Sequence, residues 1–183
     1  MPLELVTPPP SSPTAARVAR AKRAYTTRHV PAFAFAQLLE DPGQAPRAGD
    51  LVLARVQRVG KHTTLEQTDS RRSALFPGDE IVVAYAARYA PDQFEACVPA
   101  SLQACHLAAG GGVAALVTAR HGGVSAPTEL QPLGLLADAG GQRLNLASHA
   151  RLPQAARGSA GPRPLTIASL GTSMNAGKTT SAA

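Results

Sequence analysis

Near the end of the sequence, glycine, lysine and threonine residues follow one another in the pattern of a phosphate-binding loop. The segment reads Gly-Thr-Ser-Met-Asn-Ala-Gly-Lys-Thr-Thr and spans residues 171–180. In such loops, backbone N–H groups and the positive end of the following helix surround the oxygens of a phosphate. The pattern predicts a nucleotide partner, ATP or GTP, bound together with Mg²⁺.

Each residue type in the loop has a chemical role under this hypothesis. Gly177 permits close approach of the backbone to the phosphates, Lys178 reaches the terminal phosphates as a point charge, and the Thr179 hydroxyl ligates Mg²⁺. The predicted nucleotide-binding residues are Gly171, Thr172, Asn175, Ala176, Gly177, Lys178, Thr179 and Thr180. Thr179 is the predicted metal ligand, and the sequence assigns no catalytic residue.

The spacing of the loop differs from the standard motif. Five residues separate Gly171 from Gly177, where four are usual, and Thr172 stands where the first glycine belongs. This stretch resembles the loop of dethiobiotin synthetase, in which Gly-Thr also opens a nine-residue stretch ending in Gly-Lys-Thr. The wider group of deviant P-loop proteins, including the cobyrinate amidases and the molybdopterin-guanine dinucleotide accessory ATPases, looks similar.

Residue by residue, the resemblance implies that Lys178 contacts phosphate and that Thr179 binds Mg²⁺. Ser173 departs from the pattern, because the synthetase has an acidic side chain there and the septum-site and partition ATPases have their signature lysine. The segments 49–56 and 75–85, followed by the loop, also resemble a group of uncharacterised bacterial P-loop proteins in which a small β domain precedes the NTPase. This resemblance implies a P-loop NTPase or an ATP-dependent ligase or kinase whose second substrate is unknown.

A phosphate-binding loop of this type lies between a β-strand and an α-helix. The β-rich run 165–170 is the expected first strand of an α/β sheet, and a helix is expected to start near Gly177. Since the sequence stops three residues after Thr180, we expect residues 165–183 to be the truncated start of an NTPase domain. Alone, this chain is then expected to be inactive.

The preceding part of the chain predicts a mainly β fold. Short apolar runs separated by Gly, Pro and Asp favour a small antiparallel β-barrel or sandwich domain over residues 31–148. Strands are expected at 50–59, 63–67, 80–85 and 113–118, a hairpin at 133–146 and a short helix at 31–39. Residues 1–30 are a predicted flexible basic leader, and residues 149–164, which hold several prolines, a predicted linker.

Composition and charge limit the remaining functions. No window approaches 18 apolar residues and no secretion signal is present, which favours a cytoplasmic protein without a membrane partner. The net charge is +6, and basic residues near the first strands leave open an alternative, a β-barrel module that binds nucleic acid or a protein without catalysis. These residues are Arg55, Arg58, Lys61, Arg71 and Arg72. The scarcity of aromatic residues for base stacking disfavours nucleic acid.

Two cysteines and a histidine suggest a metal site only weakly. Cys97, Cys105 and His106 lack the Cys-x-x-Cys pairing of a zinc site. We therefore expect buried, unreactive cysteines.

Overall fold

Most of the described chain is β-structure. This computed structural model describes residues 12–150, 165, 167–171 and 176–182. The strands are β1 (Lys22–Arg23), β2 (Gln37–Leu39), β3 (Leu51–Arg58), β4 (Thr64–Glu66), β5 (Arg72–Ala74), β6 (Glu80–Tyr85), β7 (Arg88–Tyr89), β8 (Phe94–Cys97), β9 (Cys105–Ala109), β10 (Val113–Arg120) and β11 (Thr128–Ala137). The helices are α1 (Pro13–Arg20), the 3₁₀ turns η1 (Tyr25–Thr27), η2 (Ala32–Ala34) and η3 (Leu146–His149), and α2 (Lys178–Ala182).

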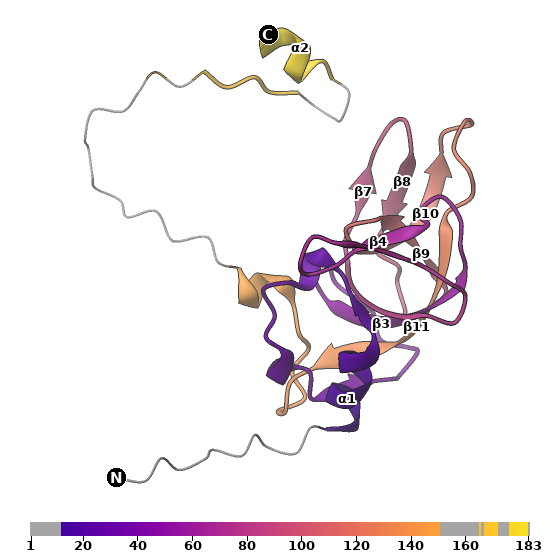
Figure 1. The fold of residues 1–183 in the computed structure, drawn as a ribbon, viewed down its shortest axis with the longest axis vertical. Coiled ribbons are helices and arrows are strands. Elements are labelled where there is room, and N and C mark those ends of the chain that lie inside the picture. Colours follow the sequence, from indigo (N-terminus) through magenta and orange to yellow (C-terminus); the bar gives the residue numbers. More distant parts are fainter. Residues whose placement is uncertain (1–11, 151–164, 166, 172–175, 183) are drawn as a thin grey trace.

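Five of the strands close into a barrel (Figure 1). β6 pairs with β3, β3 with β11, β11 with β9 and β9 with β10, all antiparallel. β10 then returns to β6 in parallel through Val113 and Ala114. The mainly β class is confirmed, but the sheet is mixed rather than purely antiparallel.

Alternation along β3 and β6 divides their side chains between two cores. Val52, Ala54 and Val56 of β3 lie in a cluster with Leu107 and Leu130, inside the barrel. Leu51 and Leu53 of β3 and Val82 and Ala84 of β6 face outward and are also buried, because other chain segments cover this side. Strands covered on both faces read as nearly continuous apolar runs, which explains the composition of residues 51–56.

The cover over the outer face comes from the N-terminal segment. Ser12 caps α1 by accepting the Ala15 N–H on its hydroxyl, and α1 buries Val18 beside Val30 and Phe35. β1 continues into a parallel pairing with β6. Residues 12–30, for which the sequence predicted a flexible leader, therefore pack on the barrel, and residues 1–11 lie outside the described residues.

Several local expectations change in the folded chain. The segment 31–39 is the η2 turn followed by β2, which pairs with β11, and not a single helix. The returning strand expected at 63–67 is β4, but it pairs with β5 in a separate ladder. The turn expected near 138–142 forms and brings the Leu144 N–H onto the Leu136 carbonyl at 2.8 Å, although residues 143–146 form no regular strand.

The barrel closes at Gly112, between β9 and β10. The carbonyl of Gly112 accepts the N–H of Ala84 and the hydroxyl of Thr26, both at 3.0 Å. Its φ is +103°, and a Cβ added there would lie 2.1 Å from the Cβ of Ala24. Only glycine lets the N-terminal segment approach this closely.

A pair of glycine substitutions tests this close approach. Gly112→Ala is expected to lower the free energy of unfolding by about 3 kcal/mol or more, since it adds a steric clash to an unfavourable φ. Gly78→Ala is the matched control, because Gly78 also has a positive φ, of 93°, but no atom lies within 4 Å of the added Cβ. Its expected cost is about 1 kcal/mol, from φ alone. Urea denaturation measures both, and equal losses would contradict the packing argument.

Candidate functional site

The predicted phosphate-binding loop is described at both of its ends. Gly171 and residues 176–180 are described, whereas Thr172 and Asn175 lie outside the described residues. α2 starts at Lys178, as expected, directly after Gly177. The φ of Gly177 is +75°, in the left-handed region that favours glycine.

The two ends of the loop lie against each other. A Cβ added at Gly171 would lie 2.8 Å from the Cβ of Ala176 and 2.9 Å from the Cγ of Lys178. The hydroxyl of Ser169 donates to the carbonyl of Lys178 at 3.0 Å. The first glycine of the motif is therefore in contact with the stem of the motif's lysine.

The run before the loop differs from the expectation. Its described residues, 165 and 167–170, form no strand, and Leu165, Ile167 and Leu170 are 86–90% exposed. A first strand of a parallel sheet is covered on both faces and hydrogen-bonded to neighbours. Within the part of the chain that is described, no strand forms hydrogen-bonded pairs with residues 165–170.

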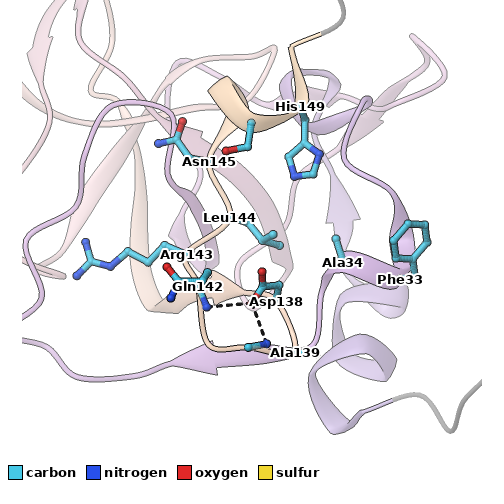
Figure 2. A pocket seen from close by; sticks show the side chains of 11 residues that line it. Phe33, Ala34, Asp138, Ala139, Gln142, Arg143, Leu144, Asn145 and His149 are labelled. Atoms are coloured by element: carbon cyan, nitrogen blue, oxygen red, sulfur yellow. Dashed lines mark hydrogen bonds between the residues drawn. The ribbon is translucent and has the colours of Figure 1, made fainter.

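A pocket of about 480 Å³ lies on the barrel, between η2 and the turn after β11 (Figure 2). Phe33 and Ala34 line one side, and Leu144, Asn145 and His149 lie across from them. The Asp138 carboxylate holds the turn by accepting the N–H groups of Gly140 and Gln142, both at 2.9 Å. The Asp138 carboxylate therefore stabilises the turn.

A neighbouring pocket of about 600 Å³ contains a buried acid, Asp50. Its carboxylate accepts the Arg47 N–H at 2.9 Å and the Asn145 side-chain amide at 2.8 Å. Arg143 adds an ion pair at 3.6 Å. With both oxygens engaged, Asp50 fixes the residues around the pocket and is not poised as a base.

Cys97, Cys105 and His106, which the sequence weakly suggested as metal ligands, differ in exposure and in hydrogen bonding. Cys105 is buried, and burial raises the pKa of its thiol to about 12, whereas Cys97 is exposed. His106 accepts the Val117 N–H on Nδ1 at 3.1 Å, and burial lowers the pKa of its imidazole. Among the described residues, no three His, Cys, Asp or Glu side chains gather closely enough to hold a metal ion.

Acidic partners neutralise most of the basic residues near the first strands. Arg55 pairs with Glu80, Arg58 with Glu129 and Arg71 with Asp69. By contrast, Lys61 and Arg72 form no ion pair with any described residue, and both line a polar pocket beside the turn between β9 and β10. The sequence does not predict this pocket, because its lining residues lie in two separate parts of the chain, 61–72 and 110–111.

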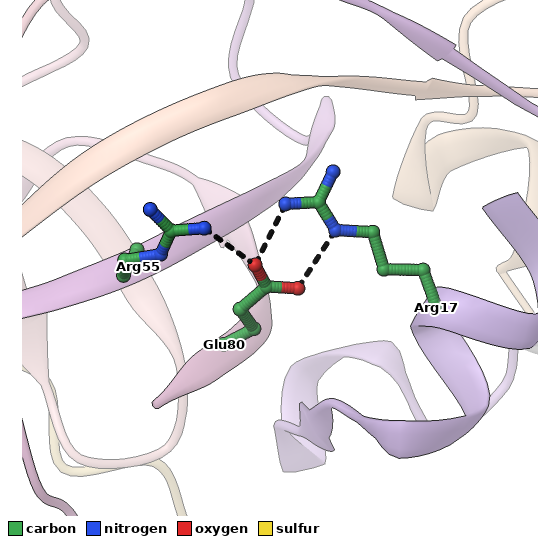
Figure 3. A network of polar contacts seen from close by, with 3 residues as sticks. All are labelled: Arg17, Arg55 and Glu80. Atoms are coloured by element: carbon green, nitrogen blue, oxygen red, sulfur yellow. Dashed lines mark hydrogen bonds and ion pairs between the residues drawn. The ribbon is translucent and has the colours of Figure 1, made fainter. Parts of the chain in front are cut away.

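Glu80 is the centre of an ionic cluster that joins α1 to the barrel (Figure 3). Arg17 of α1 donates to both carboxylate oxygens, from Nε at 2.8 Å and from Nη2 at 2.7 Å. Arg55 of β3 donates to the same carboxylate at 3.0 Å. The Arg17 hydrogen bonds, assisted by Arg55, lower the pKa of Glu80 to about 2.

The chain was compared with protein-family models, with curated proteins and with solved structures, and none of them matches it. Within the described residues, no helix is both long and apolar enough to cross a lipid bilayer.

The Glu80 cluster predicts a pH-dependent stability. Because folding lowers the pKa of Glu80, its contribution is complete above the unfolded value near 4.5 and is lost as the pH falls toward about 2. Glu80→Gln is expected to cost about 1 kcal/mol of unfolding free energy at pH 7 and progressively less below pH 4.5.

Thermal unfolding measured at pH 7, 4 and 2.5 checks this expectation. Glu129→Gln is the control, because it removes the exposed ion pair with Arg58 and is expected to change stability less. A Glu80→Gln deficit that stays constant down to pH 2.5 would show that the ionised carboxylate does not stabilise the fold.

Proposed function

We propose that the loop at residues 171–180 binds the phosphates of ATP or GTP together with Mg²⁺. The observation that carries the proposal is the Gly177-Lys178-Thr179 motif together with the backbone conformation of Gly177 and the close packing at Gly171. Gly177 has a left-handed φ, and Gly171 leaves no room for a side chain beside Lys178. Both features favour a loop in which backbone N–H groups turn toward one anion.

The proposed division of roles follows the chemistry of each group. The ammonium of Lys178 neutralises charge on the terminal phosphates, and the Thr179 hydroxyl supplies an oxygen ligand to Mg²⁺, which prefers hard oxygen donors. Thr180 contacts the α-phosphate region. Thr172, Asn175 and Ala176 contribute backbone groups that line the loop.

The wider proposal concerns the class of protein. We assign residues 12–148 to a β domain and residues 165–183 to a P-loop nucleotide-binding segment. The resemblance of the loop to that of dethiobiotin synthetase supports an ATP-dependent ligase, kinase or NTPase acting in the cytoplasm. Ser173, which departs from that family, leaves its specific reaction unassigned.

Nucleic-acid binding by the barrel is the less favoured function. It requires basic side chains that are free to meet phosphates. Carboxylates already engage Arg55, Arg58 and Arg71. The exposed cations that remain near the first strands, Lys61 and Arg72, flank one small pocket and not an extended groove.

The proposal predicts that Lys178→Ala weakens nucleotide binding. Calorimetric titration of the full-length protein with Mg·ATP and Mg·GTP is expected to show a loss of affinity of about tenfold or more, since a charge-assisted contact to phosphate disappears. Arg71→Ala, which removes one exposed positive charge elsewhere, is the control and is expected to bind as the wild type does. Equal affinity of the wild type and Lys178→Ala would refute the proposal.

A second substitution tests the metal ligand. Thr179→Ala is expected to reduce the gain in ATP affinity that Mg²⁺ provides, with a smaller effect on ATP measured in EDTA. Ser181→Ala is the control, because it also removes a hydroxyl from α2, one that donates to the Gly177 carbonyl. A Thr179→Ala protein with an unchanged Mg²⁺ dependence would remove Thr179 from the metal site.

A further inference from the structure

The polar pocket beside the β9–β10 turn has a volume of about 330 Å³ and lies apart from the phosphate loop in sequence. Strands β4 and β5 and the turn itself supply most of its walls. Its lining residues are Lys61, His62, Thr63, Thr64, Glu66, Arg72, Gly110 and Gly111. The two cations and one carboxylate leave the lining with a positive balance.

The cations of this pocket are free of acidic partners. Arg71, the neighbour of Arg72, forms an ion pair with Asp69 at 3.7 Å, and most other arginines near the barrel strands are also engaged. Lys61 and Arg72 are exposed and form no ion pair with any residue that the structure describes. Two cations without an ion pair, against the single carboxylate of Glu66, give the pocket a net positive charge that favours an anionic ligand.

The diglycine turn supplies donors that the protein itself does not use. The carbonyls of Gly110 and Gly111 accept the N–H groups of Glu66 at 2.8 Å and Thr26 at 3.1 Å, which fixes the turn. Within the described part of the chain, neither the Gly110 nor the Gly111 N–H donates a hydrogen bond to the backbone or to a side chain. Unused N–H groups on consecutive residues of a fixed turn are typical of anion-binding concavities.

His62 adds an acceptor to the same wall. Its Nε2 lies 3.0 Å from the Ala108 carbonyl, which can only accept, so Nε2 carries the proton. Burial, with Arg88 and Lys61 nearby, lowers the pKa of the imidazole, which favours its neutral form. Nδ1, which lies 3.7 Å from a Cβ position at Gly110, is therefore a lone-pair acceptor for a hydroxyl.

We propose that this pocket binds a small tetrahedral oxyanion, phosphate or a phosphate monoester. Lys61 and Arg72 neutralise its charge, and the N–H groups of Gly110 and Gly111 donate to its oxygens. His62 accepts a hydrogen bond on Nδ1 from its hydroxyl group. Glu66 opposes the negative charge, so it limits affinity and favours an oxyanion that still carries a proton. The pocket is independent of the loop that contains Lys178.

The test is a titration of the ¹⁵N-labelled chain with inorganic phosphate, followed through the amide signals of Gly110 and Gly111. A Lys178→Ala background separates this pocket from the phosphate loop. Both signals are expected to shift and saturate with one dissociation constant. Glycerol 2-phosphate, titrated in parallel, distinguishes the sources, because tighter binding than phosphate identifies a monoester and weaker binding identifies the free ion.

Four variants are expected to affect phosphate binding differently. Arg72→Ala and Lys61→Ala are each expected to weaken phosphate binding about fivefold, whereas Arg71→Ala is expected to leave it unchanged. Glu66→Gln is expected to tighten binding about threefold, because it removes the opposing charge. Absence of a saturable shift at Gly110 and Gly111 would overturn the proposal. Equal weakening by Arg71→Ala and Arg72→Ala would do so as well, since it would indicate general attraction to a basic surface.

Discussion

Closure of the barrel at Gly112 is the constraint on which the rest of the structure depends. The carbonyl of this one residue receives hydrogen bonds from β6 and from the N-terminal segment, while its missing side chain leaves the space that Ala24 occupies. The parallel junction between β6 and β10 lies directly beside it. Without this contact the inner core would have an open edge between those two strands, with unpaired backbone groups along it.

The same constraint explains why the N-terminal segment is part of the domain. Ala24 can reach Gly112 only if β1 lies along β6, and β1 in turn brings α1 over the outward residues of β3 and β6. Arg17 then meets Glu80, and Lys22 meets Asp79. Two charges of the segment that the sequence predicted as a flexible basic leader, those of Arg17 and Lys22, therefore bind carboxylates on the barrel.

The sequence predicts the strands whose signal is local and misses the features that depend on distant partners. β6 is a β-rich apolar run and β3 alternates apolar and polar residues after Val52, so both were predicted as strands. Residues 113–118 of β10 fit a strand or a helix by composition, and the glycines before them favoured a strand. α1 carries only one buried residue, Val18, and its stabilising partner Glu80 lies 63 residues away, so the sequence did not predict that this segment packs on the barrel. β11 begins at Thr128, before the predicted hairpin at 133–146, and its register with β3 shifts between Pro132 and Gly134, an irregularity that depends on the partner strand.

The two candidate anion sites also differ in whether the sequence alone predicts them. The loop at residues 171–180 was predictable because its glycines, lysine and threonine are contiguous and each type has a fixed chemical role. The barrel pocket joins Lys61, Arg72 and the Gly110 turn, which only the fold brings together. Its charge could not be inferred by counting basic residues, since Arg71 and Arg72 are adjacent and only one of them has an acidic partner. In this chain, a cation is available to a ligand where the fold leaves it without a carboxylate, and an excess of basic residues alone does not locate such a place.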